Sequence, residues 1–92
     1  MTTRPKITHV AIRVDDVIYA LPAPNRHHHI IRWMVDEKGF RSVEAHGDDQ
    51  GFVDAEGNYL TRTQALVSAQ ANGQLRSDRP IWHDELYSEN LW

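Results

Sequence analysis

Cysteine is absent from the 92 residues, so no disulfide can stabilise a small core, and nothing argues for an oxidising compartment. No apolar run approaches the roughly 20 residues that a membrane-spanning helix needs. No signal peptide precedes the first predicted strand, and we therefore expect an intracellular protein. With 40% hydrophobic and 25% charged residues, the composition is that of a globular domain rather than a disordered chain. We expect a single domain over residues 1–92, with a frayed terminus at 1–6.

A basic stripe is also absent, since the formal net charge is -3 with histidine neutral. A duplex DNA binder usually carries such a stripe, so non-specific DNA binding is disfavoured. The positive residues are instead local. Arg26 and Arg32 lie among three histidines, Arg76 and Arg79 occupy a later loop, and acidic residues gather at 48–56 and 84–89. This balance permits a small anionic ligand held by a few nearby cations.

The first regular pattern is an alternation of apolar and other residues over 7–14, which predicts a half-buried strand. Asp15 and Asp16 form a two-residue turn, and 17–21 returns as a second strand. A tight hairpin places Val14 opposite Val17, Ile12 opposite Tyr19 and Val10 opposite Leu21.

The stretch from Leu21 to Val35 organises the rest of the chain. Two prolines predict a stiff bend over 22–25, with Asn25 as the cap of a helix from about 26 to 38 that ends at Gly39. The buried stripe of this helix is predicted to be Ile30, Ile31, Met34 and Val35. Trp33 falls off that stripe and needs a neighbouring segment or a partner subunit to cover it.

The start of this helix is the sharpest functional hint. Four residues follow the cap, where the helix dipole is positive and backbone N–H groups are free: Arg26, His27, His28 and His29. A phosphate-bearing ligand suits such a place.

Residues 40–49 read as a loop, and 50–60 as a second hairpin whose turn needs the positive φ that Gly57 supplies. Thr61 and Gln64 fit a capping box for a second helix over about 62–71, ended by Gly73. Its stripe of Ala65, Leu66 and Ala69 suits close packing. The fold class is therefore α+β: a small antiparallel sheet of two hairpins with two helices packed on it, and an irregular C-terminal tail at 74–92 that packs on the body or on a neighbouring subunit.

Catalytic and metal chemistry find little support in the sequence. Three consecutive histidines fan around a helix by 100° each, whereas helical zinc pairs lie at i, i+4, so only His9 or His46 could complete a site through the tertiary fold. There is no G-x-S-x-G serine, phosphate loop or dinucleotide fingerprint. We expect no metal, no cofactor and no enzymatic activity. The remaining enzymatic alternative is a small histidine-dependent nucleotide hydrolase.

A nucleotide can be bound by stacking its base on an aromatic ring and pairing its phosphates with guanidinium groups. The candidates for stacking are Phe52, Tyr59 and Trp33, and those for phosphate are Arg26, Arg62, Arg76 and Arg79. For Phe52 the alternative interpretation is an ordinary core residue.

Several segments together resemble a known family. These are Leu21-Pro22-Ala23-Pro24-Asn25-Arg26 with the histidines behind it, Gln50-Gly51-Phe52, Gly57-Asn58-Tyr59-Leu60-Thr61-Arg62, and the tail Leu86-Tyr87-Ser88-Glu89-Asn90-Leu91-Trp92. Over about 17–92 the chain resembles phage proteins of the first Thoeris anti-defence family. Such proteins sequester a cyclised ADP-ribose immune signal without degrading it, and some also hold cyclic oligonucleotides.

The resemblance implies an α+β domain that assembles as a homodimer or a trimer of dimers in the cytoplasm of an infected bacterium. It implies that Arg26 contacts the ligand and that Phe52 stacks on its base. Thr61 and Arg62 stand where the family has an asparagine contact, and either Arg76 or Arg79 would be a later loop contact. A protein–protein inhibitor of a bacterial defence complex, using Trp33, Trp82 and Trp92, is the alternative from another class.

Overall fold

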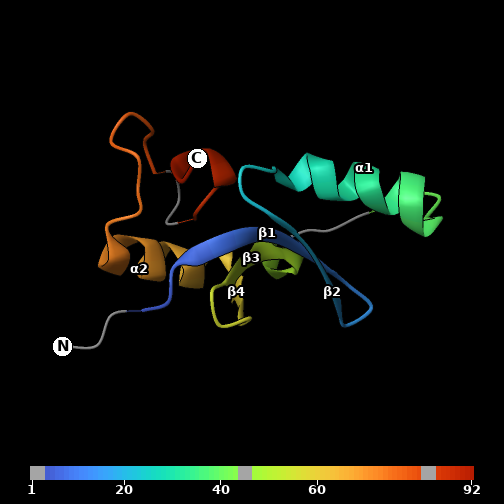
Figure 1. Ribbon diagram of the computed structural model, residues 1–92, viewed down its shortest axis with the longest axis horizontal. Coiled ribbons are helices and arrows are strands. Elements are labelled where there is room, and N and C mark those ends of the chain that lie inside the picture. Colours follow the sequence, from blue (N-terminus) through green and yellow to red (C-terminus); the bar gives the residue numbers. More distant parts are fainter. Residues whose placement is uncertain (1–3, 44–46, 82–84) are drawn as a thin grey trace.

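A computed structural model describes residues 4–43, 47–81 and 85–92 of the chain. The elements are β1 (Ile7–Val14), β2 (Val17–Pro22), α1 (His27–Lys38), β3 (Gln50–Asp54), β4 (Tyr59–Thr61) and α2 (Arg62–Asn72), with short 3-10 turns at Gly47–Asp49 and Ser88–Asn90. Figure 1 shows α1 and the C-terminal segment above the strands, with α2 at the left beside the start of β1. The predicted α+β class is confirmed.

The four strands form one antiparallel sheet in the order β2-β1-β3-β4. The first hairpin has the predicted register, with Val14 opposite Val17, Ile12 opposite Tyr19 and Val10 opposite Leu21. Both turn residues have positive φ, 50° at Asp15 and 62° at Asp16. This is the geometry of a type I′ turn, whose twist matches that of the strands beside it.

The second hairpin joins β3 to β4 around Gly57, whose φ is 85° as its turn requires. The Asp54 carboxylate is buried and accepts hydrogen bonds from the backbone N–H groups of Glu56 and Asn58, each at 3.0 Å. Strand β3 begins at Gln50 as predicted and continues one residue further, to Asp54, whereas β4 ends at Thr61, one residue beyond the predicted hairpin.

Helix α1 departs from prediction at its start. Asn25 does not cap it; its side-chain amide donates back to the Pro22 carbonyl at 2.7 Å. The cap position is Arg26, and the ring Nδ1 of His29 accepts the Arg26 backbone N–H at 2.8 Å. The helix ends at Gly39 as predicted, but Val35 is 37% exposed, and only Ile30 and Met34 of the predicted stripe are fully buried.

Helix α2 has the predicted capping box: the Gln64 N–H donates to Thr61 Oγ1, and Gln64 Oε1 accepts the Thr61 N–H. It ends one residue after the predicted Ala71, and Gly73 has the left-handed conformation expected of a C-terminal cap. Ala65, Leu66 and Ala69 are buried, as their stripe predicted.

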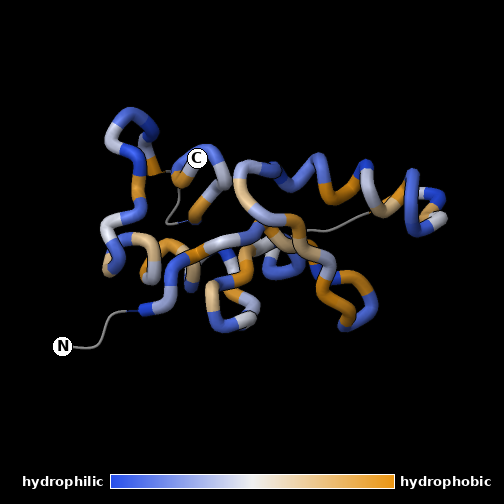
Figure 2. Tube along the Cα trace, viewed as in Figure 1, coloured by the Kyte–Doolittle hydropathy of each residue, from blue (hydrophilic) through white to orange (hydrophobic). Residues whose placement is uncertain are grey.

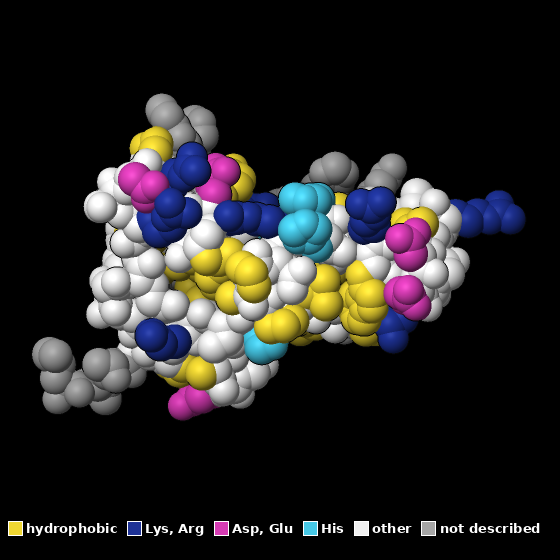
Figure 3. Space-filling model, turned by 45° about the horizontal axis from the view of Figure 1, so that its top comes forward, with side chains coloured by type: hydrophobic (Ala, Val, Ile, Leu, Met, Phe, Trp, Pro, Cys, Tyr) yellow, Lys and Arg dark blue, Asp and Glu magenta, His cyan; other side chains and the backbone are white. Residues whose placement is uncertain are grey.

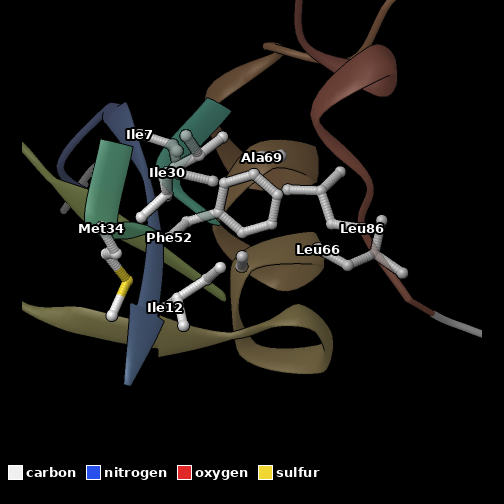
Figure 4. Close-up of a cluster of buried hydrophobic side chains, with 10 residues drawn as sticks. Ile7, Ile12, Ile30, Met34, Phe52, Leu66, Ala69 and Leu86 are labelled. Carbon is white, nitrogen blue, oxygen red and sulfur yellow. The ribbon is translucent and has the colours of Figure 1, made fainter. Parts of the chain in front are cut away.

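The core lies between the helices and one face of the sheet, where apolar segments of both layers meet (Figure 2). Val10, Ile12 and Phe52 come from the strands, Ile30 and Met34 from α1, and Leu66 from α2. Figure 4 shows the Phe52 ring surrounded by these side chains. Leu86 of the tail completes the cluster with no exposed surface. The described part of the tail therefore packs on the body of its own chain.

Candidate functional site

Arg62, at the start of α2, links three segments of the chain. Its guanidinium donates to the Leu86 carbonyl at 2.9 Å and to the side-chain oxygen of Gln50. It also lies 4.4 Å from the ring centroid of Tyr87, a cation–π distance. Burial lowers the pKa of Arg62 from its usual value, but an arginine keeps its proton at neutral pH. A partly buried positive charge is thus fixed between α2, β3 and the tail.

Arg26, at the start of α1, reaches the same part of the tail. Its guanidinium donates to the hydroxyl of Ser88 at 3.2 Å. Next to it, the indole N–H of Trp92 donates to the carbonyl of Asn25 at 2.9 Å. We call the place where Arg26, Arg62 and the tail residues Leu86–Ser88 meet the tail junction. It brings together two of the predicted ligand contacts that are 36 positions apart in sequence.

His27, the first residue of α1, lies near the Arg62 charge of the tail junction. Its Nε2–H donates to the Gly51 carbonyl at 2.8 Å, and its ring packs edge-on against Phe52, with 5.2 Å between centroids. Burial, followed by the nearby charge of Arg62, lowers the pKa of His27 to about 4, although the bond to Gly51 opposes the shift. His27 is therefore neutral at pH 7 and holds α1 to β3.

The low pKa of His27 predicts a specific loss of stability in mild acid. The unfolded chain takes up this proton near pH 6.5, whereas the folded chain resists it until about pH 4. The free energy of unfolding that this pKa difference contributes is fully present above pH 6.5 and is lost as the pH falls toward 4. It amounts to at most roughly 3 kcal/mol. Urea unfolding at pH 7.5, 5.5 and 4.5 measures it.

His27→Gln is the informative variant for this prediction, because an amide can still donate to Gly51 but does not titrate. The stability difference between wild type and His27→Gln should shrink as the pH falls. The exposed neighbour variant His28→Gln should keep the pH dependence of the wild type. An unchanged pH dependence in His27→Gln would show that other groups cause it.

His28 and His29 lie on the outer side of the same helix turn and are exposed. Their rings stand 4.1 Å apart between centroids, tilted by 52°. In Figure 3 a row of Lys, Arg and His side chains crosses the upper part of the molecule. The two exposed imidazoles thus lie outward of the tail junction along α1.

Two of the predicted contacts have other tasks in this structure. Phe52 has no exposed surface and lies in the core, so its ring has no face to offer a ligand. Phe52 is therefore a core residue in this structure, as the alternative interpretation had it. The stacking role that the resemblance implies stays a prediction, and it would require the ring to leave the core. The Thr61 hydroxyl accepts the Gln64 N–H and so caps α2.

The later arginines lie beyond the tail junction. Arg76 makes a two-point contact with the carboxylate of Asp78, with distances of 3.1 and 2.7 Å, and its backbone N–H donates to the Asn90 carbonyl. Arg79 is exposed. Because Asp78 already neutralises Arg76, Arg79 is the better placed of the two to meet an anion from solvent.

The sequence patterns did not single out Gln50, Tyr87 or Ser88 as parts of a site, although all three contact an arginine of the tail junction. The sequence signal that could have indicated Tyr87 and Ser88 was the tail motif, which contains both residues. Tyr87 is partly exposed, and its hydroxyl donates to Glu85 at 3.1 Å. That bond raises the pKa of Tyr87 above its usual value.

The tryptophans proposed for a protein interface mostly serve the fold. Trp33 packs against Tyr19, with 6.4 Å between ring centroids, and the Lys38 ammonium lies over it at 5.1 Å. Trp92 is bound to Asn25, as described above, while Trp82 lies outside the described residues. No group of histidine and carboxylate side chains suited to a metal ion occurs within the described ranges, and His46 falls outside them.

Comparison with known proteins identifies the chain. The fold is a small two-layer α+β domain whose charged site joins a helix start to the C-terminal tail. The chain belongs to the phage T4 y16D protein family, whose model matches residues 6–92, and it is thus a phage protein. No curated protein and no solved structure matches it. No helix in the described parts of the chain is long and apolar enough to cross a membrane.

Proposed function

We propose that this phage protein binds and sequesters a cyclic nucleotide immune signal of the bacterial host, of the glycocyclic ADP-ribose type, and that it does so in the host cytoplasm without degrading the signal. The observation that carries the proposal is the convergence of Arg26 and Arg62 on tail residues Leu86–Ser88. Two fixed guanidinium groups beside a positive helix end suit the two phosphates of such a ligand.

In this arrangement the ligand phosphates replace weak partners of the arginines. Within the described residues the Arg26 guanidinium is bound only to the neutral hydroxyl of Ser88, at 3.2 Å, and charge-assisted bonds to phosphate are shorter and stronger. His28 and His29 add N–H donors at the rim. Tyr87, which already stacks on Arg62, replaces Phe52 as the aromatic contact for the base.

Capture without turnover agrees with the chemistry of the histidines. A general base needs a pKa near the working pH, whereas the pKa of His27 is about 4 and its Nε2–H is bound to a backbone carbonyl. The other histidines of this helix are exposed, with no carboxylate bound to either ring within the described residues. Affinity then rests on charge pairing and burial of the ligand.

A thermal-shift screen tests the ligand class directly. The purified protein is mixed with glycocyclic ADP-ribose isomers, linear ADP-ribose and cyclic oligonucleotides. A bound ligand at 100 times its dissociation constant adds about 2.7 kcal/mol of stability. We expect a cyclic species to give this shift and to be recovered intact by mass spectrometry after heating. Recovery of a cleaved product would instead indicate a hydrolase, and no shift with any compound would reject the proposed ligand class.

Arg26→Ala tests the site within the same assay. Loss of one charge-assisted hydrogen bond should raise the dissociation constant roughly 10- to 100-fold, as measured by titration calorimetry. The matched control is Arg32→Ala on the same helix, because the Arg32 side chain is 83% exposed and its ion pair with Asp36 spans 3.9 Å. The control should bind as the wild type does. Equal affinities for both variants would place the ligand elsewhere.

A further inference from the structure

Strand β2 leaves one edge of the sheet open. In the order β2-β1-β3-β4 it is an outer strand, paired only with β1. Val14 and Val17 flank the two-residue turn and form a hydrogen-bonded backbone pair. Because backbone groups alternate in direction along a strand, the N–H and C=O groups of Val17, Tyr19 and Leu21 face β1. Those of Ile18 and Ala20 therefore point away from the sheet. Across the described residues, neither Ile18 nor Ala20 makes a further backbone hydrogen bond on that side.

Most of this edge lacks the features that usually protect an outer strand. Natural edge strands carry charges, prolines or bulges that prevent pairing with another chain. Strand β2 has a proline at its last residue, Pro22, but the segment 17–21 has no charged residue, glycine or proline, and its pairing with β1 runs without a register shift. Its first two side chains are exposed, Val17 by 50% and Ile18 by 45%. The opposite edge differs, because β4 has three residues and leads directly into α2.

We propose that the open edge of β2 is a self-association surface, on which β2 of a second copy pairs antiparallel to form one continuous sheet across a homodimer. With the two-fold axis at Tyr19, Ile18 of each copy lies opposite Ala20 of the other. An antiparallel strand pair is self-complementary, so one contact closes the assembly at two copies. This inference does not depend on the ligand.

Charge favours a second copy and fixes its direction. The acidic turn of Asp15 and Asp16 precedes β2, whereas no acidic residue stands between its end at Pro22 and Asp36. An antiparallel pair with its axis at Tyr19 therefore keeps the two acidic turns at opposite ends, each facing the uncharged end of the other copy's β2. A parallel pair would bring the two acidic turns together. The uncharged centre of the strand adds no repulsion between copies.

Light scattering coupled to size-exclusion chromatography measures the expected mass. The wild type should elute at twice the chain mass of 10.6 kDa. Ile18→Lys places two like charges diagonally on either side of the two-fold axis, and Ala20→Pro removes an outward N–H that β1 does not use. Both should elute at 10.6 kDa with the circular dichroism of the wild type. The control Val67→Lys changes an equally exposed residue, 46%, on α2 and should remain dimeric.

Hydrogen exchange supplies a second measurement that does not require a variant. The amides of Ile18 and Ala20 should be protected at concentrations where the protein is dimeric and should exchange rapidly on dilution. A monomeric wild type would overturn the proposal. So would a dimer that Ile18→Lys leaves intact while these two amides exchange freely, because the contact would then lie on another surface. An open-ended series of larger species would indicate β2 pairing with a different edge.

Discussion

Gly51→Ala is expected to cost about 3 kcal/mol or more of the free energy of unfolding, the upper part of the range for overpacking a buried site. Gly51 is buried in the middle of β3, between Ala11 on β1 and Thr61 on β4. A Cβ there would overlap the backbone oxygen of Leu60 and stand 2.9 Å from the Cζ and the hydroxyl oxygen of Tyr59. A backbone oxygen within a sheet cannot move without breaking the strand pairing.

Urea unfolding of this variant needs a control that separates crowding from backbone preference. Gly57→Ala serves, since Gly57 has a φ of 85° and open space around its Cα, so only the conformational cost of roughly 1 kcal/mol applies. The double variant Gly51→Ala with Tyr59→Ser should recover little stability, because the Leu60 oxygen remains. Full recovery would show that the tyrosine ring, rather than the backbone, sets the limit.

Features of the fold that depend on neighbours in sequence could be predicted. The Asp15–Asp16 turn, the Thr61–Gln64 capping box and the stops at Gly39 and Gly73 each follow from a short-range steric or hydrogen-bond preference. The hairpin register followed from the turn, because a two-residue loop permits a single pairing. Such rules do not require knowledge of the rest of the chain.

The features that failed depend on contacts between distant segments. Asn25 has the right residue type for a cap, but Pro22 competes for its side chain and Trp92 takes its carbonyl. The tail junction depends on where the tail crosses α1 and α2, which no periodicity over 74–92 encodes. Sequence analysis could therefore nominate Arg26 and Arg62 separately, but it could not pair them through Leu86–Ser88.

Phe52 is the residue for which the family resemblance and the structure disagree most. The resemblance implies that Phe52→Ala loses the ligand while the fold remains intact. The structure places the ring in the core with 0% exposure, among Ile12, Ile30 and Leu86. Removing it should therefore cost about 3–5 kcal/mol, the usual range for a buried aromatic residue. A domain of this size has on the order of 5–14 kcal/mol in total, so much of its stability would be lost.

Denaturant unfolding and ligand titration together separate a core role from a ligand role. Phe52→Leu keeps most of the volume and should cost less than about 1.5 kcal/mol, yet it removes the aromatic face. If Phe52 is only a core residue, Phe52→Leu binds the ligand with wild-type affinity, whereas a Tyr87→Leu variant loses affinity. If Phe52→Leu is stable but does not bind, the ring must leave the core to meet the ligand. The interior of the domain would then rearrange on binding, and the tail that covers Phe52 through Leu86 would have to move with it.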